Sequence, residues 1–394
     1  MKLSLLRRRC QRTGGLIGEI VLQRIPENRA AGGTGAAGRF HYMIGTQKGG
    51  IMKRRSVTKG RLLAVLILTV VAGFRTVWSA APATLVAQER IMVSYAGFAG
   101  FQAPVWAAKD FGLFAKYGLS TDLVMIPGSA RGTQALLAGS THFGQIDGTA
   151  LISAINQGAD LVIISASLNK FPFSLVAQNN IRKPADLIGK KVGIVSFGGA
   201  HEVSLVLALK EWNIPRQSVT LLASGPAANR LIALSAGALD ATLLAPPETG
   251  EAARMGLHTL AHMTDLKAAA FPMNVIATRR SFLEKNRDLV KRFLQAYSEA
   301  TYQFMTNKEK SLAMFNQRLK QKNPGVVEET YQYFAATFSF PPRVAHDGMR
   351  IVIEMIAQRT PGAKLETNVD KYVDERLLDE LEREGLFKRI SGKG

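Results

Sequence analysis

The sequence predicts an α/β protein of two lobes, each built on a mostly parallel sheet flanked by helices. Three observations predict this fold: short apolar runs alternate with helical patterns from residue 90 onward, that pattern repeats itself, and the chain beyond residue 278 turns purely helical. At 394 residues the chain is long enough for two such lobes, since domains usually hold about 100 to 200 residues. An apolar fraction of 47% with 20% charged residues is ordinary for a packed globular protein.

The predicted strands are short apolar or β-branched runs bounded by turn residues. They are 91–95, 122–126, 142–146, 161–165, 174–177, 191–195, 219–222, 241–245 and 275–278. Helices fill the gaps between them. Further along, apolar residues at helical spacing predict helices over 288–304, 324–338, 344–359 and 370–384, the last closed by Gly385. We expect these late helices to pack on the first lobe.

One five-residue pattern, Ala-Leu-x-Ala-Gly, occurs twice at an offset of 98 residues, over 135–139 and 233–237. A turn precedes each copy at the same distance, another turn follows each, and a further glycine lies 19 residues beyond each, at Gly158 and Gly256. Because these features share one offset, we infer that the two lobes are built alike.

The net charge of +20 is concentrated at the amino-terminal end. The first 80 residues hold 15 Lys and Arg against 2 Asp and Glu, which leaves +7 for the rest of the chain. A moderately basic surface of mixed sign does not indicate binding to a phosphate backbone. We therefore expect no nucleic-acid partner.

Residues 52–83 have the pattern of a secretory signal peptide. Basic residues precede an apolar run over 62–72, and small residues follow over 79–83. The run is about half as long as a helix that spans a bilayer, although an uncleaved anchor is an alternative. We expect a mature chain that begins between residues 80 and 88 and is periplasmic.

Residues 1–51 are rich in Gly and Arg and lack apolar periodicity. We interpret them as a misassigned extension ahead of a true start at Met52. The one cysteine of the sequence, Cys10, lies in this segment. The mature chain is thus expected to have neither a disulfide nor a thiol catalyst.

Two α/β lobes that face each other predict a ligand cleft. In open α/β sheets, ligands bind at the carboxyl ends of the strands, where the following helices begin. The loops at those ends are 97–102, 128–131, 147–149, 196–201, 225–229 and 245–248. They are rich in Gly, Ser and Pro, which lets backbone N–H groups approach a small molecule closely.

Four segments carry a family resemblance: 104–118 (PVWAAKDFGLFAKYG), 135–139 (ALLAG), 186–193 (DLIGKKVG) and 230–240 (RLIALSAGALD). Together they resemble the solute-binding proteins of nitrate-, sulfonate- and taurine-type ABC importers, whose domain is shared with fungal thiamine-pyrimidine synthase. The resemblance covers residues 90–278. It implies a periplasmic-binding-protein (Venus-flytrap) fold whose hinge is formed by two crossover strands, 174–178 and 274–278. The lobes would be 88–177, 178–273, and a return to the first lobe over 274–394.

The predicted ligand-binding residues lie in the cleft loops and near the crossover strands. Backbone N–H groups at 198–201 would hold an acceptor end of the ligand, and Asp147 would accept from a donor end, which disfavours nitrate or sulfate. An Asp147 that only caps its own helix is the alternative. The full set is Phe98, Phe101, Gln102, Gly128, Ser129, Arg131, Asp147, Gly148, Thr149, Phe171, Phe197, Gly198, Gly199, Ala200, His201, Gly225, Pro246, Glu248 and Asn274.

Other roles stay open for two members of this set. His201 either contacts the ligand or takes a solvent-exposed or capping role. Arg131 either pairs with an anionic ligand or points to solvent, as arginines at helix starts commonly do. The phenylalanines suit an organic ligand, whereas Trp106 is expected to pack in the core of its helix.

The resemblance implies a monomeric, non-enzymatic binding protein that closes around a small organic molecule (sulfonate-, pyrimidine- or carboxylate-like) and delivers it to the permease and ATPase of an ABC importer. No cofactor or metal is expected, since His258 and His262 lack a framing carboxylate or cysteine. No catalytic residue is predicted, because no nucleophile or phosphate-loop motif stands in context. The alternatives are an enzyme on the same scaffold, related to thiamine-pyrimidine synthesis, and a sensory protein that presents its ligand to a receptor.

Overall fold

The structure is a computed structural model that describes residues 90–359 and 368–392. The predicted extension over 1–51, the predicted signal peptide over 52–83 and Cys10 lie outside these residues. Within the described ranges, no helix combines the length and the apolar character needed to cross a bilayer.

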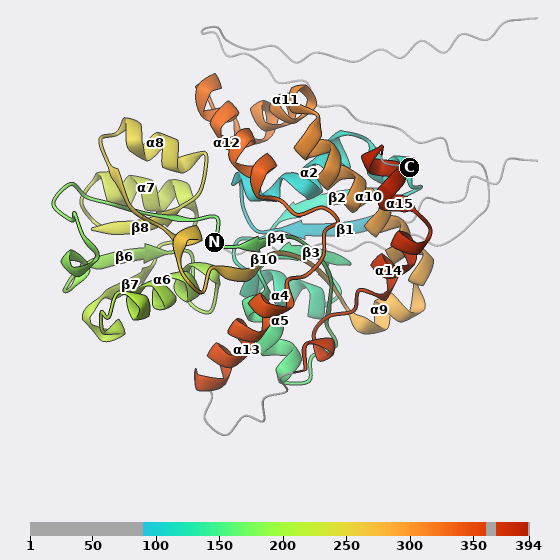
Figure 1. Cartoon of the computed structure of the whole chain (residues 1–394), viewed down its shortest axis with the longest axis horizontal. Coiled ribbons are helices and arrows are strands. Elements are labelled where there is room, and N and C mark those ends of the chain that lie inside the picture. The colour runs from blue at the N-terminus through green and yellow to red at the C-terminus, as the bar shows by residue number, and fades with distance from the viewer. Residues whose placement is uncertain (1–89, 360–367, 393–394) are drawn as a thin grey trace, which may run out of the picture. The chain divides into compact units, whose positions relative to one another are not determined.

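The described strands form two five-stranded sheets of the same topology, β2-β1-β3-β10-β4 and β7-β6-β8-β5-β9 (Figure 1). Their bounds are β1 (Arg90–Tyr95), β2 (Ser120–Met125), β3 (Phe143–Ile146), β4 (Val162–Lys170), β5 (Ser174–Ala177), β6 (Lys191–Ile194), β7 (Thr220–Ala223), β8 (Ala241–Leu244), β9 (His258–His262) and β10 (Ala270–Thr278). Runs of Val, Ile and Leu that are buried on both faces suit the centre of such sheets. The two predicted lobes therefore have one architecture.

One strand in each sheet runs against its neighbours. β10 pairs antiparallel with β3 and β4, and β5 pairs antiparallel with β8 and β9, whereas β1 and β6 pair in parallel with the strands beside them. The other four strands of each sheet thus share one direction. The prediction of mostly parallel sheets is confirmed, and the strands that run against them are those predicted as crossovers.

The chain passes between the sheets twice, over 171–173 and over 263–269. The two crossings lie side by side, because the N–H of Met263 donates to the carbonyl of Phe173 at 2.8 Å. The crossings come slightly before the lobe boundaries proposed from the sequence, since β5 belongs to the second sheet and β10 already begins at Ala270.

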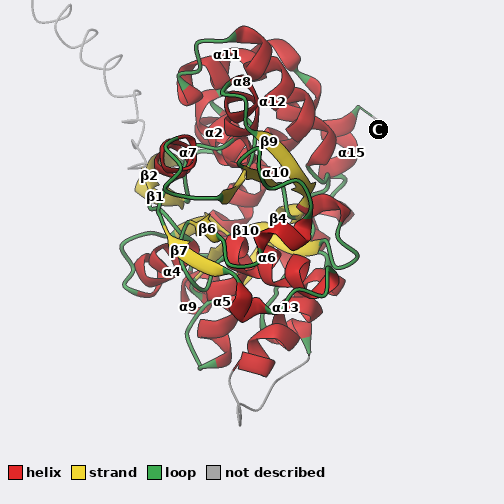
Figure 2. Cartoon of the chain, turned by 90° about the vertical axis from the view of Figure 1, so that its left-hand side faces the viewer, coloured by secondary structure: helices red, strands yellow, loops and turns green. Residues whose placement is uncertain are grey.

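Helices cover both faces of the first sheet, with α10 to α12 on one side and α4, α5 and α13 on the other (Figures 1 and 2). The α-helices are α2 (Ala103–Asp110), α3 (Leu113–Lys116), α4 (Ser129–Leu137), α5 (Gly148–Asn156), α6 (Ala200–Glu211), α7 (Ala227–Ser235), α8 (Glu248–Arg254), α9 (Arg280–Lys285), α10 (Arg287–Thr306), α11 (Lys308–Leu319), α12 (Pro324–Thr337), α13 (His346–Arg359), α14 (Arg376–Arg383) and α15 (Leu386–Ser391). Short 3-10 turns are η1 (Gly100–Gln102), η2 (Pro184–Leu187), η3 (Arg216–Ser218), η4 (Met263–Asp265) and η5 (Val369–Lys371).

The late helices complete the core of the first lobe, as predicted. The apolar face expected for α10 is buried, and its Phe293 stacks on Phe143 of β3 with ring centroids 3.9 Å apart. Burying a phenylalanine side chain stabilises a fold by roughly 1.5–3 kcal/mol. α13 packs on β10 and α5 in the same lobe. The chain's return to the first lobe is therefore held by burial of apolar side chains.

The repeated pattern ends a helix in each lobe. Gly139 follows α4 with φ +70°, and Gly237 follows α7 with φ +73°. In both copies the glycine N–H donates to the carbonyl of the leucine three residues earlier at 3.0 Å, as in a helix end with a left-handed glycine. The repeat inferred from the sequence is confirmed by this common local structure.

Candidate functional site

Two adjoining cavities lie where the carboxyl ends of strands from both sheets meet. The inner cavity, of about 70 Å³, is lined by Ala96, Phe101, Gln102, Gly128, Ser129, Ile146, Asp147, Phe173, Val195, Ser196, Gly199, Ala200, His201, Met273 and Asn274. The outer cavity, of about 150 Å³, is lined by Ala96, Gly97, Phe98, Ala99, Phe101, Met125, Pro127, Phe173, Val195, His201, Pro226, Ala227, Ala228, Arg230, Ala245 and Glu248. Because the two share five lining residues, we treat them as one cleft between the lobes.

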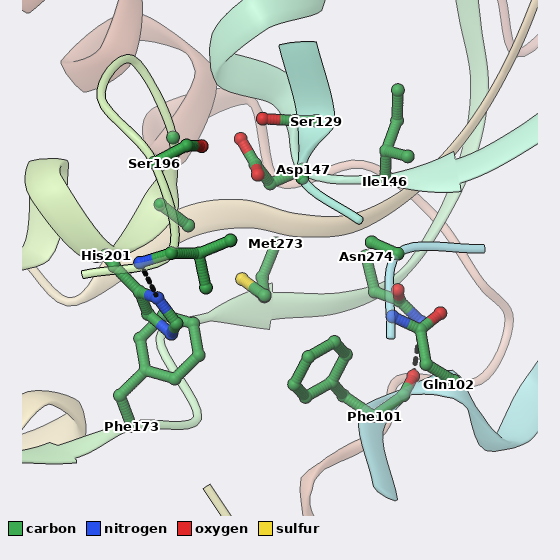
Figure 3. A pocket seen from close by; sticks show the side chains of 15 residues that line it. Phe101, Gln102, Ser129, Ile146, Asp147, Phe173, Ser196, His201, Met273 and Asn274 are labelled. Carbon is green, nitrogen blue, oxygen red and sulfur yellow. Dashed lines mark hydrogen bonds between the residues drawn. The ribbon is translucent and has the colours of Figure 1, made fainter. Parts of the chain in front are cut away.

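Asp147 and Ser129 of the first lobe lie side by side at one end of the inner cavity (Figure 3). Asp147 follows β3 and caps α5, since its Oδ1 accepts the N–H of Thr149 at 3.0 Å. Burial raises the pKa of the Asp147 carboxyl, and hydrogen bonds from Ser129, Thr149 and the N–H of Ala200 oppose that rise. The carboxylate thus caps its own helix and also faces the second lobe.

The amino-terminal end of α6 is the feature of the second lobe that Asp147 faces. A Cβ built on Gly199 would lie 3.5 Å from Ser129 Oγ and 3.9 Å from Asp147 Oδ2. The first turn of a helix attracts negative charge. Here the Asp147 carboxylate supplies that charge, so Asp147 and the α6 end, which the sequence placed at opposite ends of a ligand, face each other instead.

Gln102 and Asn274 occupy another end of the inner cavity (Figure 3). Asn274 Nδ2 donates to the carbonyl of Phe101 at 2.8 Å and to Ser167 Oγ at 3.0 Å. Gln145 Nε2 donates to Gln102 Oε1 at 2.7 Å. Both lining side chains are 1% exposed and are held by the core beneath them. Gln102 and Asn274 therefore form a polar end of the inner cavity that is held in place before a ligand binds.

His201 lies between the two cavities, with Phe173 packed edge-on against its ring at 4.2 Å. Its Nδ1 accepts the N–H of Val195 at 3.3 Å, which leaves Nε2 as the protonated nitrogen of a neutral ring. Burial lowers the pKa of His201 well below its usual value, and repulsion from Arg230 adds to this. His201 is a half-buried, neutral part of the cleft wall.

Arg230 of α7 and Glu248 of α8 line the outer cavity from the second lobe. Arg230 is 2% exposed; its Nε donates to the carbonyl of Gly225 and its Nη1 to Thr242 Oγ1, each at 3.0 Å, and Nη1 also donates to the carbonyl of Leu243. Burial lowers the pKa of Arg230 to about 10, so its guanidinium stays charged at neutral pH. Burial raises the pKa of the Glu248 carboxyl to about 7.

The cleft brings together more than half of the residues predicted from the sequence. Those that line a cavity are Phe98, Phe101, Gln102, Gly128, Ser129, Asp147, Gly199, Ala200, His201, Glu248 and Asn274. Those that line neither cavity are Arg131, Gly148, Thr149, Phe171, Phe197, Gly198, Gly225 and Pro246.

Three of the outlying residues are exposed or engaged within their own loop. Arg131 is exposed on α4, which agrees with the solvent-facing alternative. Phe197 is 55% exposed. The N–H of Gly198 donates to Glu202 Oε2 at 2.6 Å and is therefore engaged within its own loop. The expected contacts of these residues with a ligand are not supported by where they lie.

Other outlying residues support the cleft from behind. Phe171 is fully buried and stacks on Phe271 with centroids 4.3 Å apart. A Cβ on Gly148 would lie 2.8 Å from Pro272, and Thr149 is buried with its N–H on Asp147. The carbonyls of Gly225 and Pro246 accept hydrogen bonds from Arg230 and from the N–H of Gly100.

Sequence reasoning missed Phe173, Met273 and Arg230 as lining residues. Phe173 is two residues past the predicted Phe171, at the point where the chain leaves the first sheet. Arg230 carried a usable signal: at the repeat offset of 98 it corresponds to Gly132 of the first lobe. A large cation in place of a buried glycine marks a departure from an otherwise shared pattern.

Metal binding finds no support in the cleft. Among the residues that the structure describes, no group of three or more His, Cys, Asp or Glu side chains is placed to hold a metal ion. Since its ring is neutral and hydrogen bonded to the backbone, His201 acts as a wall and a potential donor.

The chain is similar to proteins named for binding a ligand. A family model described as NMT1/THI5 like matches residues 101–311. The chain is 27% identical over 206 residues to the taurine-binding periplasmic protein of Escherichia coli (strain K12), covering 52% of this chain and 64% of that relative. The match therefore spans slightly less than two thirds of the relative's own length.

Solved structures share the fold. The ligand-binding component of an ABC-type import system from Staphylococcus aureus superposes with a TM-score of 0.63 at 18% identity, covering 74% of this chain and 99% of that one. The periplasmic aliphatic sulphonate-binding protein of Escherichia coli gives a TM-score of 0.58 at 21% identity, covering 73% and 98%. The predicted two-lobed fold and the family resemblance are confirmed, and each of these three proteins is named for binding.

Proposed function

Because the chain belongs to the NMT1/THI5-like family, we propose that it is an exported, non-enzymatic solute-binding protein that captures a small organic molecule for an ABC importer. One observation carries this proposal: a cleft of two joined cavities, lined by both lobes, holds buried polar side chains within aromatic walls. Ligand sites are typically concave and largely apolar, with a few fixed polar groups. The predicted signal peptide and the names of the relatives support a periplasmic location.

The mechanism we propose is closure about the two chain crossings. Phe171 and Phe271 stack beside these crossings, and hydrogen bonds also join the lobes away from them. The N–H of Gly100 donates to the carbonyl of Pro246 at 3.3 Å, and Gln321 Nε2 donates to Glu251 Oε1 at 2.5 Å. A ligand that contacts both lobes favours the closed arrangement, because it binds that arrangement better than the open one. The closed form would then dock on the permease.

The test is a thermal-shift screen of the purified protein with taurine and other sulfonates, pyrimidines, aromatic carboxylates and short amides. A ligand at 100 times its dissociation constant stabilises the protein by about 2.7 kcal/mol. Small-angle scattering should show compaction with each stabilising compound, and the compound should be recovered unchanged. Turnover would favour the enzyme alternative, while failure of the whole screen would contradict the proposal.

A further inference from the structure

Among the described residues, three buried side-chain atoms in the cleft lining have no hydrogen-bond partner: Ser129 Oγ and Gln102 Nε2 in the inner cavity, and Glu248 Oε2 in the outer cavity. Ser129 Oγ lies beside the Asp147 carboxylate (Figure 3), which leaves Gln102 Nε2 and Glu248 Oε2 for a ligand. A buried polar group left unpaired costs roughly 1–3 kcal/mol. Such groups are rare in native proteins, and each calls for an explanation. A ligand in the cleft that forms hydrogen bonds with both Gln102 Nε2 and Glu248 Oε2 is such an explanation.

The donor character of Gln102 Nε2 follows from the network behind it. Gln145 Nε2 lies 3.3 Å from the backbone carbonyl of Gln102, and a carbonyl can only accept, so this atom of Gln145 is the amide nitrogen. The same nitrogen donates to Gln102 Oε1 at 2.7 Å. The oxygen of Gln102 is thus engaged with the core, and its NH₂ group is left for an acceptor on the ligand.

The charges of the cleft disfavour an anion. Among the described residues that line the two cavities, Arg230 is the only Lys or Arg, and its Nε and Nη1 already donate to three protein acceptors. His201 accepts a backbone N–H and is neutral. The amino-terminal end of α6 faces the Asp147 carboxylate. Asp147 and Glu248 therefore both repel a negatively charged ligand, and in the described lining only the Nη2 group of Arg230 is a cationic donor without a protein acceptor.

We propose that the ligand spans both cavities, accepting a hydrogen bond from Gln102 Nε2 and donating an N–H or ammonium hydrogen to Glu248 Oε2. Its middle is a flat apolar segment, because the shared wall consists of Ala96, Phe101, Phe173, Val195 and His201. The cleft selects a neutral or cationic nitrogen compound over an organic anion of the same skeleton. This inference rests on the proposed function and names the class of its ligand.

The test uses matched compounds on one ring: 4-(aminomethyl)benzamide, which carries both groups, benzamide, which lacks the donor end, and 4-sulfonatobenzamide, which replaces the ammonium by an anion. Titration calorimetry on the native protein should give a dissociation constant at least about tenfold lower for the amine than for the sulfonate. Equal or tighter binding of the sulfonate would overturn the proposal. The proposal would also be overturned if none of these three compounds binds while taurine or another compound of the screen does. In that case the proposed function stands. If neither these three compounds nor any compound of the screen binds, the proposed function fails as well.

The variant Glu248→Gln assigns the effect to the proposed atom. It should weaken binding of 4-(aminomethyl)benzamide by about tenfold while leaving benzamide within about twofold, since only the amine reaches the carboxylate. Retained benzamide binding also reports that the variant is folded. Glu284→Gln, the same change at an exposed position on α9, should alter neither affinity. If Glu248→Gln leaves the amine as tightly bound as before, the assignment of the donor end is wrong.

Discussion

Glu248 is an acidic side chain held in a largely apolar wall. Its carboxyl group lines the outer cavity together with the neutral His201 and the charged Arg230, and Glu251 lies one turn further along α8. Burial raises the pKa of Glu248 to about 7, against a usual value of 4.5, even though Arg230 attracts its charged form. In the ligand-free protein, the Glu248 carboxyl group therefore changes its charge near neutral pH.

The first prediction concerns the pH dependence of stability. Because the pKa of Glu248 is raised in the folded state, the unfolded chain loses this proton first, and stability falls as pH rises from about 4.5 to about 7. Glu248→Gln removes this loss, so between pH 4.5 and pH 8 the free energy of unfolding of the variant should gain at most about 3 kcal/mol relative to the native protein. Urea unfolding at both pH values measures it. Glu284→Gln should show no such gain, and parallel pH profiles for Glu248→Gln and the native protein would refute the prediction.

Asp147 combines two roles that the sequence left as alternatives. It caps α5 through Thr149, and it lies in the cleft opposite Ala200. We expect Asp147→Ala to lower the free energy of unfolding of the ligand-free protein by roughly 1–2 kcal/mol, the usual cost of losing a helix cap. Asp147→Asn keeps the acceptor oxygen and should cost less than half as much. Thermal melting of both variants decides the matter: equal losses would mean that the negative charge matters more than the cap.

At the scale of single elements, the sequence predicted strands well where apolar runs are short and central. β5 has the predicted bounds, and β1, β3, β6 and β8 differ by a residue at an end. β4 and β10 are longer than predicted, since Asn169, Lys170 and Pro272 interrupt the apolar pattern. β4 and β10 pair with each other, with register shifts near Asn274, and this pairing extends both strands beyond these residues. Tertiary pairing of this kind leaves no local signal in the sequence.

Gly237 allows a test of the repeated helix end. Its φ of +73° lies in the left-handed region, and a Cβ built on it would meet no atom within 4 Å. Gly237→Ala should therefore destabilise the protein through backbone strain alone, by about 1 kcal/mol. Gly97→Ala is the matched control, because Gly97 also has open space around it but no positive φ. Equal melting temperatures for the two variants would show that the left-handed turn is not required.

At the scale of the whole molecule, the sequence predicted two similar lobes and a cleft between them, but not how the loops meet. The repeat and the strand ends located the loops, because each lobe encodes its own local pattern. The approach of Asp147 to the α6 end, and the burial of Arg230, depend on how one lobe faces the other. No spacing within a lobe carries that information. For this reason the sequence predicts that Asp147 and the α6 end bind opposite ends of a ligand, although the two lie next to each other.

Contacts between the lobes outside the cavities should tune ligand affinity. Gln321, just before α12 in the first lobe, donates to Glu251 of α8 in the second at 2.5 Å, and neither residue lines the cleft. If this bond forms only when the lobes are closed, its loss lowers the closed fraction and raises the apparent dissociation constant in proportion.

Gln321→Ala should therefore weaken binding of a screen hit by about two- to tenfold, the equivalent of one net hydrogen bond. Glu251→Ala should have a similar effect, and the double variant should be no weaker than the weaker single one, since both remove the same bond. Gln332→Ala, on the exposed side of α12, is the control and should leave affinity unchanged. Titration calorimetry of the four variants measures the coupling. Additive losses would mean that the two side chains act separately, and that closure of the lobes does not depend on their contact.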